Sequence, residues 1–230
     1  MEENNNLTAE RSLEIIRKSI ETSRRAVSKT TGQSLYVSGL CTMGMAVVVA
    51  IVNLLLVNTG FSPFGHLLWF ALPVIIWLAM RNIHKQSEPV PATLIGALVG
   101  KTWWTFAVFV LGFFLTALLW NKILALSVGD PTAYLAHRVD ITPIIILLMG
   151  MAVTITGHVL KSQWLVWFGI IAALVVSVGD YAGLGTMLLA RMGASLTIVG
   201  QAEFLFPCLS VFLFAFVGLM LPGMTLKKQQ

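Results

Sequence analysis

Long apolar stretches without charge recur along this chain of 230 residues, and few fold classes can accommodate them. A helix of about 20 such residues crosses the ~30 Å hydrocarbon core of a bilayer. Hydrophobic residues make up 57% of the chain and charged residues 11%, a balance that does not suit a soluble domain of this length. The sequence therefore predicts an all-α fold, a polytopic transmembrane helical bundle.

Six spans can be placed on these stretches: residues 35–57, 64–80, a segment within 91–120, residues 141–159, a segment that ends near 180, and residues 204–221. This interpretation divides the chain into three parts. A cytoplasmic amphipathic juxtamembrane helix covers 1–33, a six-helix transmembrane domain covers 34–223, and a cytoplasmic basic tail covers 224–230.

The distribution of cations orients these spans. In the six-span arrangement, twelve of the fifteen Lys and Arg residues fall on the side of the two termini, and three fall on the other side, namely Lys122, Arg138 and Arg191. Basic residues gather on the cytoplasmic side of a membrane, so both termini are predicted to be cytoplasmic. Attraction to anionic lipid headgroups accounts for the net charge of +5, and nucleic acid is not a predicted partner.

The stretch from Ala182 to Gln201 has the length of a span, but Arg191 lies in its middle and four glycines interrupt it. A seventh span would bury Arg191 in lipid at a cost of about 2.5–3.5 kcal/mol and would move the C-terminal tail outside. The favoured interpretation is an interfacial or re-entrant segment at the outer face, or an extension of the flanking helices. A seventh span is the alternative.

The segment from Leu7 to Thr31 has the pattern of an amphipathic helix. Its expected lipid or partner contacts are four apolar residues on one face and four basic residues beside them: Leu13, Ile16, Ile20, Val27, Arg17, Lys18, Arg24 and Arg25. The favoured interpretation is a helix at the level of the anionic headgroups with its apolar face in the interface, which needs no partner except lipid. The other is a docking helix for a cytosolic protein or for a second copy of the chain.

Two weak internal similarities are present. MGMAV occurs at 43–47 and again at 149–153, and Trp-Phe occurs at 69–70 and at 167–168. Two matched triplets of spans in opposite orientations would form a 3+3 inverted repeat, as in many secondary transporters. Chance similarity between apolar segments is the alternative, and two short matches favour it.

SVGD also occurs twice, at Ser127–Asp130 and Ser177–Asp180. The second copy resembles in part the GxGD motif of intramembrane aspartyl proteases, in which paired carboxylates activate water. Ser177 replaces the first glycine of that motif, and the chain has no Tyr-Asp sequence. The favoured interpretation is a left-handed glycine that ends each helix, with the aspartate reaching headgroup water.

A polar cluster of ionisable side chains is predicted on the outer side of the bundle. Its members are Asp130, His137, Asp140, Asp180, Arg191 and Glu203. Such a set could hold a metal ion or a proton, but no HExxH motif or Cys/His spacing supports a metal site. Ion pairs such as Arg191 with Glu203 are the favoured interpretation. No catalytic residue, metal or cofactor is predicted, and Cys41 and Cys208 are expected to be small packing residues.

Three segments are similar to those of a group of small six-span bacterial inner-membrane proteins without an assigned activity. They are LTAERSLEII at 7–16, GHVLKSQ at 157–163 and LMLPGMTLKK at 219–228. The resemblance implies a multi-pass protein of the bacterial inner membrane. It implies no catalytic residue.

Two functions are consistent with these features. The first is a non-enzymatic scaffold, accessory or regulatory subunit that acts through its cytoplasmic helix, on lipid, on a cytosolic protein or as a homo-oligomer. The second is a small transporter or channel built on the inverted repeat. An intramembrane hydrolase is a distant third hypothesis.

Overall fold

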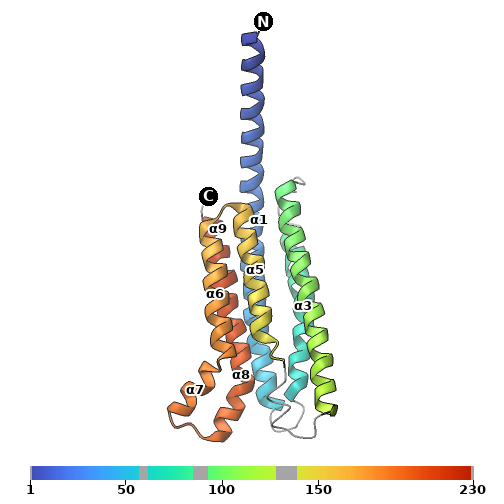
Figure 1. The fold of residues 1–230 in the computed structure, drawn as a ribbon, viewed down its shortest axis with the longest axis vertical. Helices are drawn as coiled ribbons and strands as arrows, with labels where there is room; N and C mark the ends of the chain where they lie inside the picture. The colour runs from blue at the N-terminus through green and yellow to red at the C-terminus, as the bar shows by residue number, and fades with distance from the viewer. Residues whose placement is uncertain (1, 57–61, 85–92, 128–138, 229–230) are drawn as a thin grey trace.

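The computed structural model describes residues 2–56, 62–84, 93–127 and 139–228 (Figure 1). All regular structure in these four ranges is helical, which confirms the all-α prediction. Five helices are long and apolar enough to cross a membrane, and a sixth apolar helix is shorter. The long helices run nearly parallel or antiparallel to one another, so the molecule is an elongated bundle, and the short α7 lies obliquely at one end (Figure 1).

The first element, α1, is a single helix over Glu2–Leu56. Its 55 residues correspond to a length of about 80 Å, far more than a bilayer requires. The boundary expected at residues 33–34 therefore lies inside a continuous helix. Figure 1 shows the N-terminal part of α1 rising from the end of the bundle in line with the rest of the helix. A helix that lies in the headgroup plane would need a bend here, whereas α1 is continuous through residues 33–34.

Two shorter elements, η1 (Ser62–Ala71) and α2 (Leu72–His84), follow α1. The first is a 3₁₀ helix of 10 residues and the second an α-helix of 13 residues. Because a 3₁₀ helix rises about 2.0 Å per residue and an α-helix about 1.5 Å, the pair extends for roughly 40 Å. Pro73, which has no N–H to donate, lies at the junction.

The next helix, α3 (Leu94–Ser127), lies at the side of the bundle (Figure 1). It contacts α5 and α1, and its aromatic and aliphatic side chains are mostly exposed, for example Trp104 at 73% and Phe109 at 64%. An outer surface of this kind suits a helix that faces lipid tails.

Helices α5 (Thr142–Leu160) and α6 (Gln163–Tyr181) form an antiparallel hairpin. The turn is short because Lys161 adopts the left-handed conformation with φ 56°. Glycines bring the two backbones together: a Cβ on Gly150 would overlap the Cβ of Ala173, and a Cβ on Gly169 would lie 3.0 Å from the backbone nitrogen of Thr154. Small residues allow such close helix approach.

A short helix, α7 (Leu184–Arg191), connects α6 to α8 (Leu196–Phe214). Its 8 residues span about 12 Å, too little for a seventh span. Gly183 (φ 60°) and Gly193 (φ 78°) turn the chain at its two ends in the left-handed conformation that glycine adopts without strain. Residues 182–201 therefore do not form one continuous helix of span length.

The last helical run consists of α8, the π-helical segment η2 (Ala215–Met220) and α9 (Leu221–Lys228). Pro222 cannot donate to the carbonyl of Gly218, four residues earlier, which accounts for the altered hydrogen bonding in η2. This run packs along α1, where Gly32 and Gly39 face α9 and η2.

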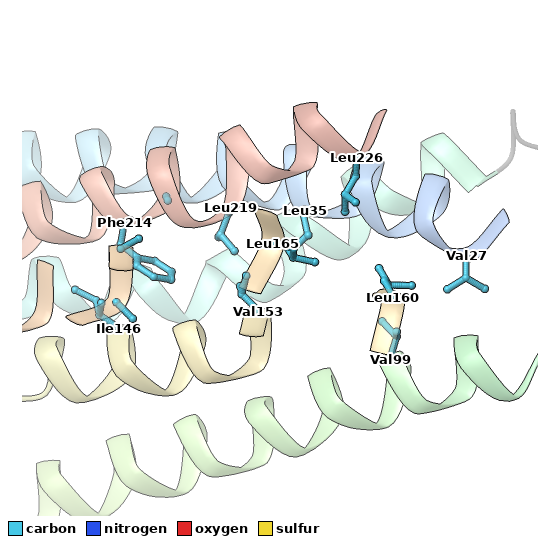
Figure 2. Close-up of a cluster of buried hydrophobic side chains, with 13 residues drawn as sticks. Val27, Leu35, Val99, Ile146, Val153, Leu160, Leu165, Phe214, Leu219 and Leu226 are labelled. Carbon is cyan, nitrogen blue, oxygen red and sulfur yellow. The ribbon is translucent and has the colours of Figure 1, made fainter. Parts of the chain in front are cut away.

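The main core joins seven elements and extends along the bundle (Figure 2). It includes buried side chains from α1, α3, α5, α6, α8, η2 and α9, among them Leu35, Val99, Val153, Leu165 and Phe214. A smaller cluster of Met45, Val49 and Cys208 packs against Leu68, Trp69 and Leu72 of η1 and α2.

Candidate functional site

The apolar face of the N-terminal part of α1 is exposed. Leu13 is 67% exposed, Ile16 54% and Ile20 47%. Val27 differs, because it is 6% exposed and belongs to the main core with Leu160 and Leu226 (Figure 2). The predicted apolar surface therefore divides at the end of the bundle: three residues are free for a contact, and Val27 anchors α1 to the other helices.

The basic residues of this segment also have different environments. Arg17, Lys18 and Arg25 are exposed, whereas the side chain of Arg24 is only 21% exposed. Glu21 accepts from Arg24 at 3.3 Å and from Arg25 at 3.5 Å. Pairs of this kind on a helix surface contribute about 0.3–0.5 kcal/mol. They support the helix but do not determine where it points.

The structure places only some residues of the predicted polar cluster near one another. Asp130 and His137 lie outside the described residues, and Glu203 lies in α8 without a described side chain. Asp140 and Asp180 lie near each other at the end of the bundle away from the termini. Arg191 is exposed at the C-terminal end of α7, at the same end of the bundle (Figure 1).

Asp180 is the member of this set that the helices enclose. Its Oδ1 accepts a hydrogen bond of 2.6 Å from the Ser210 hydroxyl on α8, and its buried Oδ2 accepts none from the residues that the structure describes. The sequence predicted instead that Gly179 ends the helix and that Asp180 reaches water. The predicted helix end is wrong, since α6 continues to Tyr181 and the left-handed glycine is Gly183, whereas Asp180 remains partly exposed.

Ser177, the first residue of the same SVGD motif, is also used for packing. It is 3% exposed, and its hydroxyl donates to the backbone carbonyl of Pro143 on α5 at 2.9 Å. A hollow of about 430 Å³ opens beside it, lined mostly by apolar side chains together with Asp140 and Tyr181. The hydroxyl is therefore committed to the α5–α6 contact, and Asp130, the carboxylate of the other SVGD copy, lies outside the described residues.

Asn121 has a positioning role that the sequence did not reveal. Its amide nitrogen donates to the carbonyl of Val139 at 3.2 Å, and its amide oxygen accepts from the Val139 N–H at 2.9 Å. This two-bond contact joins the end of α3 to the segment that enters α5. The only signal in the sequence is an asparagine directly after Trp120, where an apolar helix approaches its end.

The described residues offer few other groups for metal binding or reaction. Within the four described ranges, no group of three or more His, Cys, Asp or Glu residues could hold a metal ion. Cys41 and Cys208 form no disulfide with each other, and Cys208 is 2% exposed in the smaller cluster. Interior hydroxyls donate to carbonyls of their own helices, as Thr42 does to Ser38 and Thr156 to Ala152.

These features define a class: an all-helical protein with five helices that are long and apolar enough to cross a membrane, and with one helix that extends well beyond the bundle. No protein-family model, no curated protein and no solved structure matches the chain.

Proposed function

We propose that this chain is a non-enzymatic integral membrane protein that acts as a scaffold, accessory or regulatory subunit through the N-terminal part of α1. The observation that carries the proposal is the exposure of Leu13, Ile16 and Ile20 on a helix that stands clear of the bundle. Isolated exposed apolar residues are ordinary, but three on one face of a projecting helix form a contact surface.

The proposal includes six spans with both termini in the cytoplasm. The length of about 40 Å for η1 and α2 together supports the sixth span, because a shorter apolar α-helix alone would not reach across ~30 Å. Lys161, in the α5–α6 turn, lies at the end from which α1 emerges, whereas Lys122 and Arg191 lie at the other end (Figure 1). This distribution agrees with the positive-inside rule. The resemblance to bacterial inner-membrane proteins suggests that membrane as the location.

The interior of the bundle supports a packing role rather than a conduction pathway. Buried hydroxyls of Thr42, Thr156 and Ser177 already donate to backbone carbonyls, and an apolar core extends along the bundle. A substrate pathway at mid-membrane would require polar groups that are free to contact a solute.

Deletion of residues 2–22 tests the proposal. The shortened chain keeps Val27 and the rest of the bundle, so it should insert and remain monodisperse in mild detergent. We expect it to lose at least about tenfold of any co-purifying protein, because three apolar anchors of about 1–2 kcal/mol each are removed. Quantitative mass spectrometry of material from native membranes measures the loss, and the full-length chain purified in parallel is the control. Unchanged partners and oligomeric state with an inserted bundle would show that the proposal is wrong.

A transporter or channel is the second candidate, and one observation favours it: the partly buried Asp180 carboxylate on α6, with Ser210 as its partner. Ionisable residues within membrane spans often mark ion or substrate pathways. The internal similarities do not add to this case. Gly44 of the first MGMAV has open space around it, whereas Gly150 of the second is packed against α6.

Flux measurements in liposomes separate the two candidates. We expect the purified wild-type protein and Asp180→Asn to behave alike and to move no ion, amine or lipid under a gradient. Ser210→Ala, which removes the hydroxyl partner, serves as the matched variant. A wild-type flux that falls at least about tenfold in Asp180→Asn would support transport instead.

A further inference from the structure

Cations and aromatic side chains on α3 mark two levels at which a bilayer meets this bundle. The exposed Lys101 and Lys122 are 21 residues apart, which corresponds to about 32 Å along the helix. This distance matches the ~30 Å hydrocarbon core of a bilayer. Trp103, Trp104 and Trp120 lie just inside the two cations, as aromatic residues do at membrane interfaces. Lys101 and Lys122 therefore define the two boundaries of the hydrocarbon on α3.

The boundary at Lys122 continues across the bundle to the end of α6. Asn121, the neighbour of Lys122, holds Val139 through two hydrogen bonds. Val139 and Tyr181 both line the hollow beside Ser177. Tyr181 is 79% exposed, and tyrosine is enriched at membrane interfaces. Residue 181 thus marks the point at which α6 leaves the hydrocarbon, at the end of the bundle away from the termini (Figure 1).

The short helix α7 lies directly outside this boundary. Asp180 and Ser210 are at one level, because their side chains share a hydrogen bond of 2.6 Å. Phe206 precedes Ser210 by four residues of α8, so it lies about 6 Å farther from the hydrocarbon. A Cβ on Gly185 of α7 would overlap the Phe206 ring, which places Gly185 at the same depth. The headgroup layer is about 5–8 Å thick on each side of the hydrocarbon, so α7 begins within this layer.

At this depth α7 has one packed side and one exposed side. Its half-buried residues lie on the side that packs on α8, and they are Gly185, Thr186 and Leu189. Leu184, Met187 and Leu188 lie within about 100° of one another on the opposite side. Leu184 and Met187 are each 52% exposed, and Leu188 is 61% exposed. Arg191 continues this exposed side at the C-terminal end, and α7 contains no acidic residue.

We propose that α7 is an interfacial helix that binds phospholipid in the leaflet away from the termini. Leu184, Met187 and Leu188 reach the level at which the acyl chains begin, and the Arg191 guanidinium binds a lipid phosphate. Figure 1 shows α7 extending sideways from the end of α6, so lipid that surrounds α6 also reaches α7. Apolar helix faces insert about 5–10 Å at the boundary between headgroups and acyl chains, and arginine pairs with phosphate. This lipid contact lies at the opposite end of the molecule from the surface of the proposed function, so either can fail alone.

Depth-dependent fluorescence quenching tests the lipid contact in the full-length protein. An environment-sensitive fluorescent amino acid replaces Leu188 or, as the matched control, Ala190, which is exposed about 160° away on α7. The vesicles contain phosphatidylglycerol and phosphatidylcholine, with part of the lipid brominated near the start of the acyl chains. We expect the brominated lipid to quench the reporter at position 188 at least about threefold more strongly than at position 190, and aqueous acrylamide to show the reverse order.

Two results would overturn the proposal. Equal acrylamide quenching at positions 188 and 190 would show that water covers the apolar side of α7. Protection of position 188 from both quenchers would show that a protein covers it, either a second copy of the chain or another polypeptide. Because Leu188 and Ala190 are both exposed, neither replacement should prevent folding.

Variants of Arg191 test the phosphate contact with the same reporter at position 188. Arg191→Glu should reduce quenching by the brominated lipid at least about twofold, because phosphate repels a carboxylate, and Arg191→Lys should retain it. Lys122→Glu, which changes an exposed cation at the same boundary on α3, should leave the signal unchanged. Equal quenching in Arg191→Glu and the wild type would contradict the phosphate contact. A loss of wild-type quenching on addition of inorganic phosphate would show instead that Arg191 binds free phosphate.

Discussion

Gly150→Ala should destabilise the bundle by about 3 kcal/mol, because the added methyl group has no space between α5 and α6. The new Cβ would overlap the Cβ of Ala173 and would lie 2.9 Å from the carbonyl oxygen of Gly169. Neither atom can move by a side-chain rotation, so the two helices must separate and loosen the main core. Unfolding by SDS titration, followed by circular dichroism, measures the change in free energy.

The chain provides a close control for this substitution. Gly44 occupies the same place in the other MGMAV sequence, and a Cβ there would meet nothing within 4 Å. Gly44→Ala should be neutral or stabilising by up to about 1 kcal/mol, because alanine favours the helix more than glycine does. Ala173→Gly, combined with Gly150→Ala, should recover a large part of the lost stability. Equal effects of the Gly150 and Gly44 substitutions would contradict the packing of α5 against α6.

Gly223→Ala should separate α9 from α1 and cost about 2–3 kcal/mol. A Cβ at this position would lie 2.6 Å from the backbone nitrogen of Tyr36 and 2.8 Å from the carbonyl oxygen of Gly32. Both are backbone atoms of α1, so the strain can be relieved only by moving a helix. Leu226 and Val27, which both belong to the main core, should then become accessible.

Two measurements check this second prediction. SDS titration gives the loss of stability, and hydrogen exchange should show faster exchange in residues 221–228 than in α6. Gly100→Ala on α3 is the control, because nothing lies within 4 Å of a Cβ there. Slow exchange in α9 together with wild-type stability would mean that α9 does not pack on α1 as described.

Much of the helical arrangement could be predicted from local patterns. Uncharged apolar stretches near Leu35, Ile141 and Phe204 correspond to helices because each residue there favours burial or lipid, whatever its neighbours in space are. The glycines on either side of α7 similarly indicated that residues 182–201 do not form one uninterrupted helix. The second span was harder to define, since part of it is a 3₁₀ helix with a different rise per residue.

The polar site was less predictable, because its geometry depends on which helices become neighbours. Asp180 was expected in headgroup water on the basis of the glycine beside it. Its actual partner, Ser210, is 30 residues away on α8 and is reached only after α7 turns the chain back. Asn121 and Val139 are likewise 18 residues apart, and their two hydrogen bonds depend on the meeting of α3 with the start of α5.

Local chemistry was thus enough to define the helices, their apolar character and the amphipathic face of the N-terminal segment, because these properties depend on residues a few positions apart. The direction of that face depends on how the whole of α1 packs. Val27 and Leu35 are held against the other helices, and α1 continues without a bend, so Leu13 and Arg17 point over the end of the bundle. Only the tertiary structure, through these distant contacts, converts an amphipathic pattern into a surface with a defined orientation.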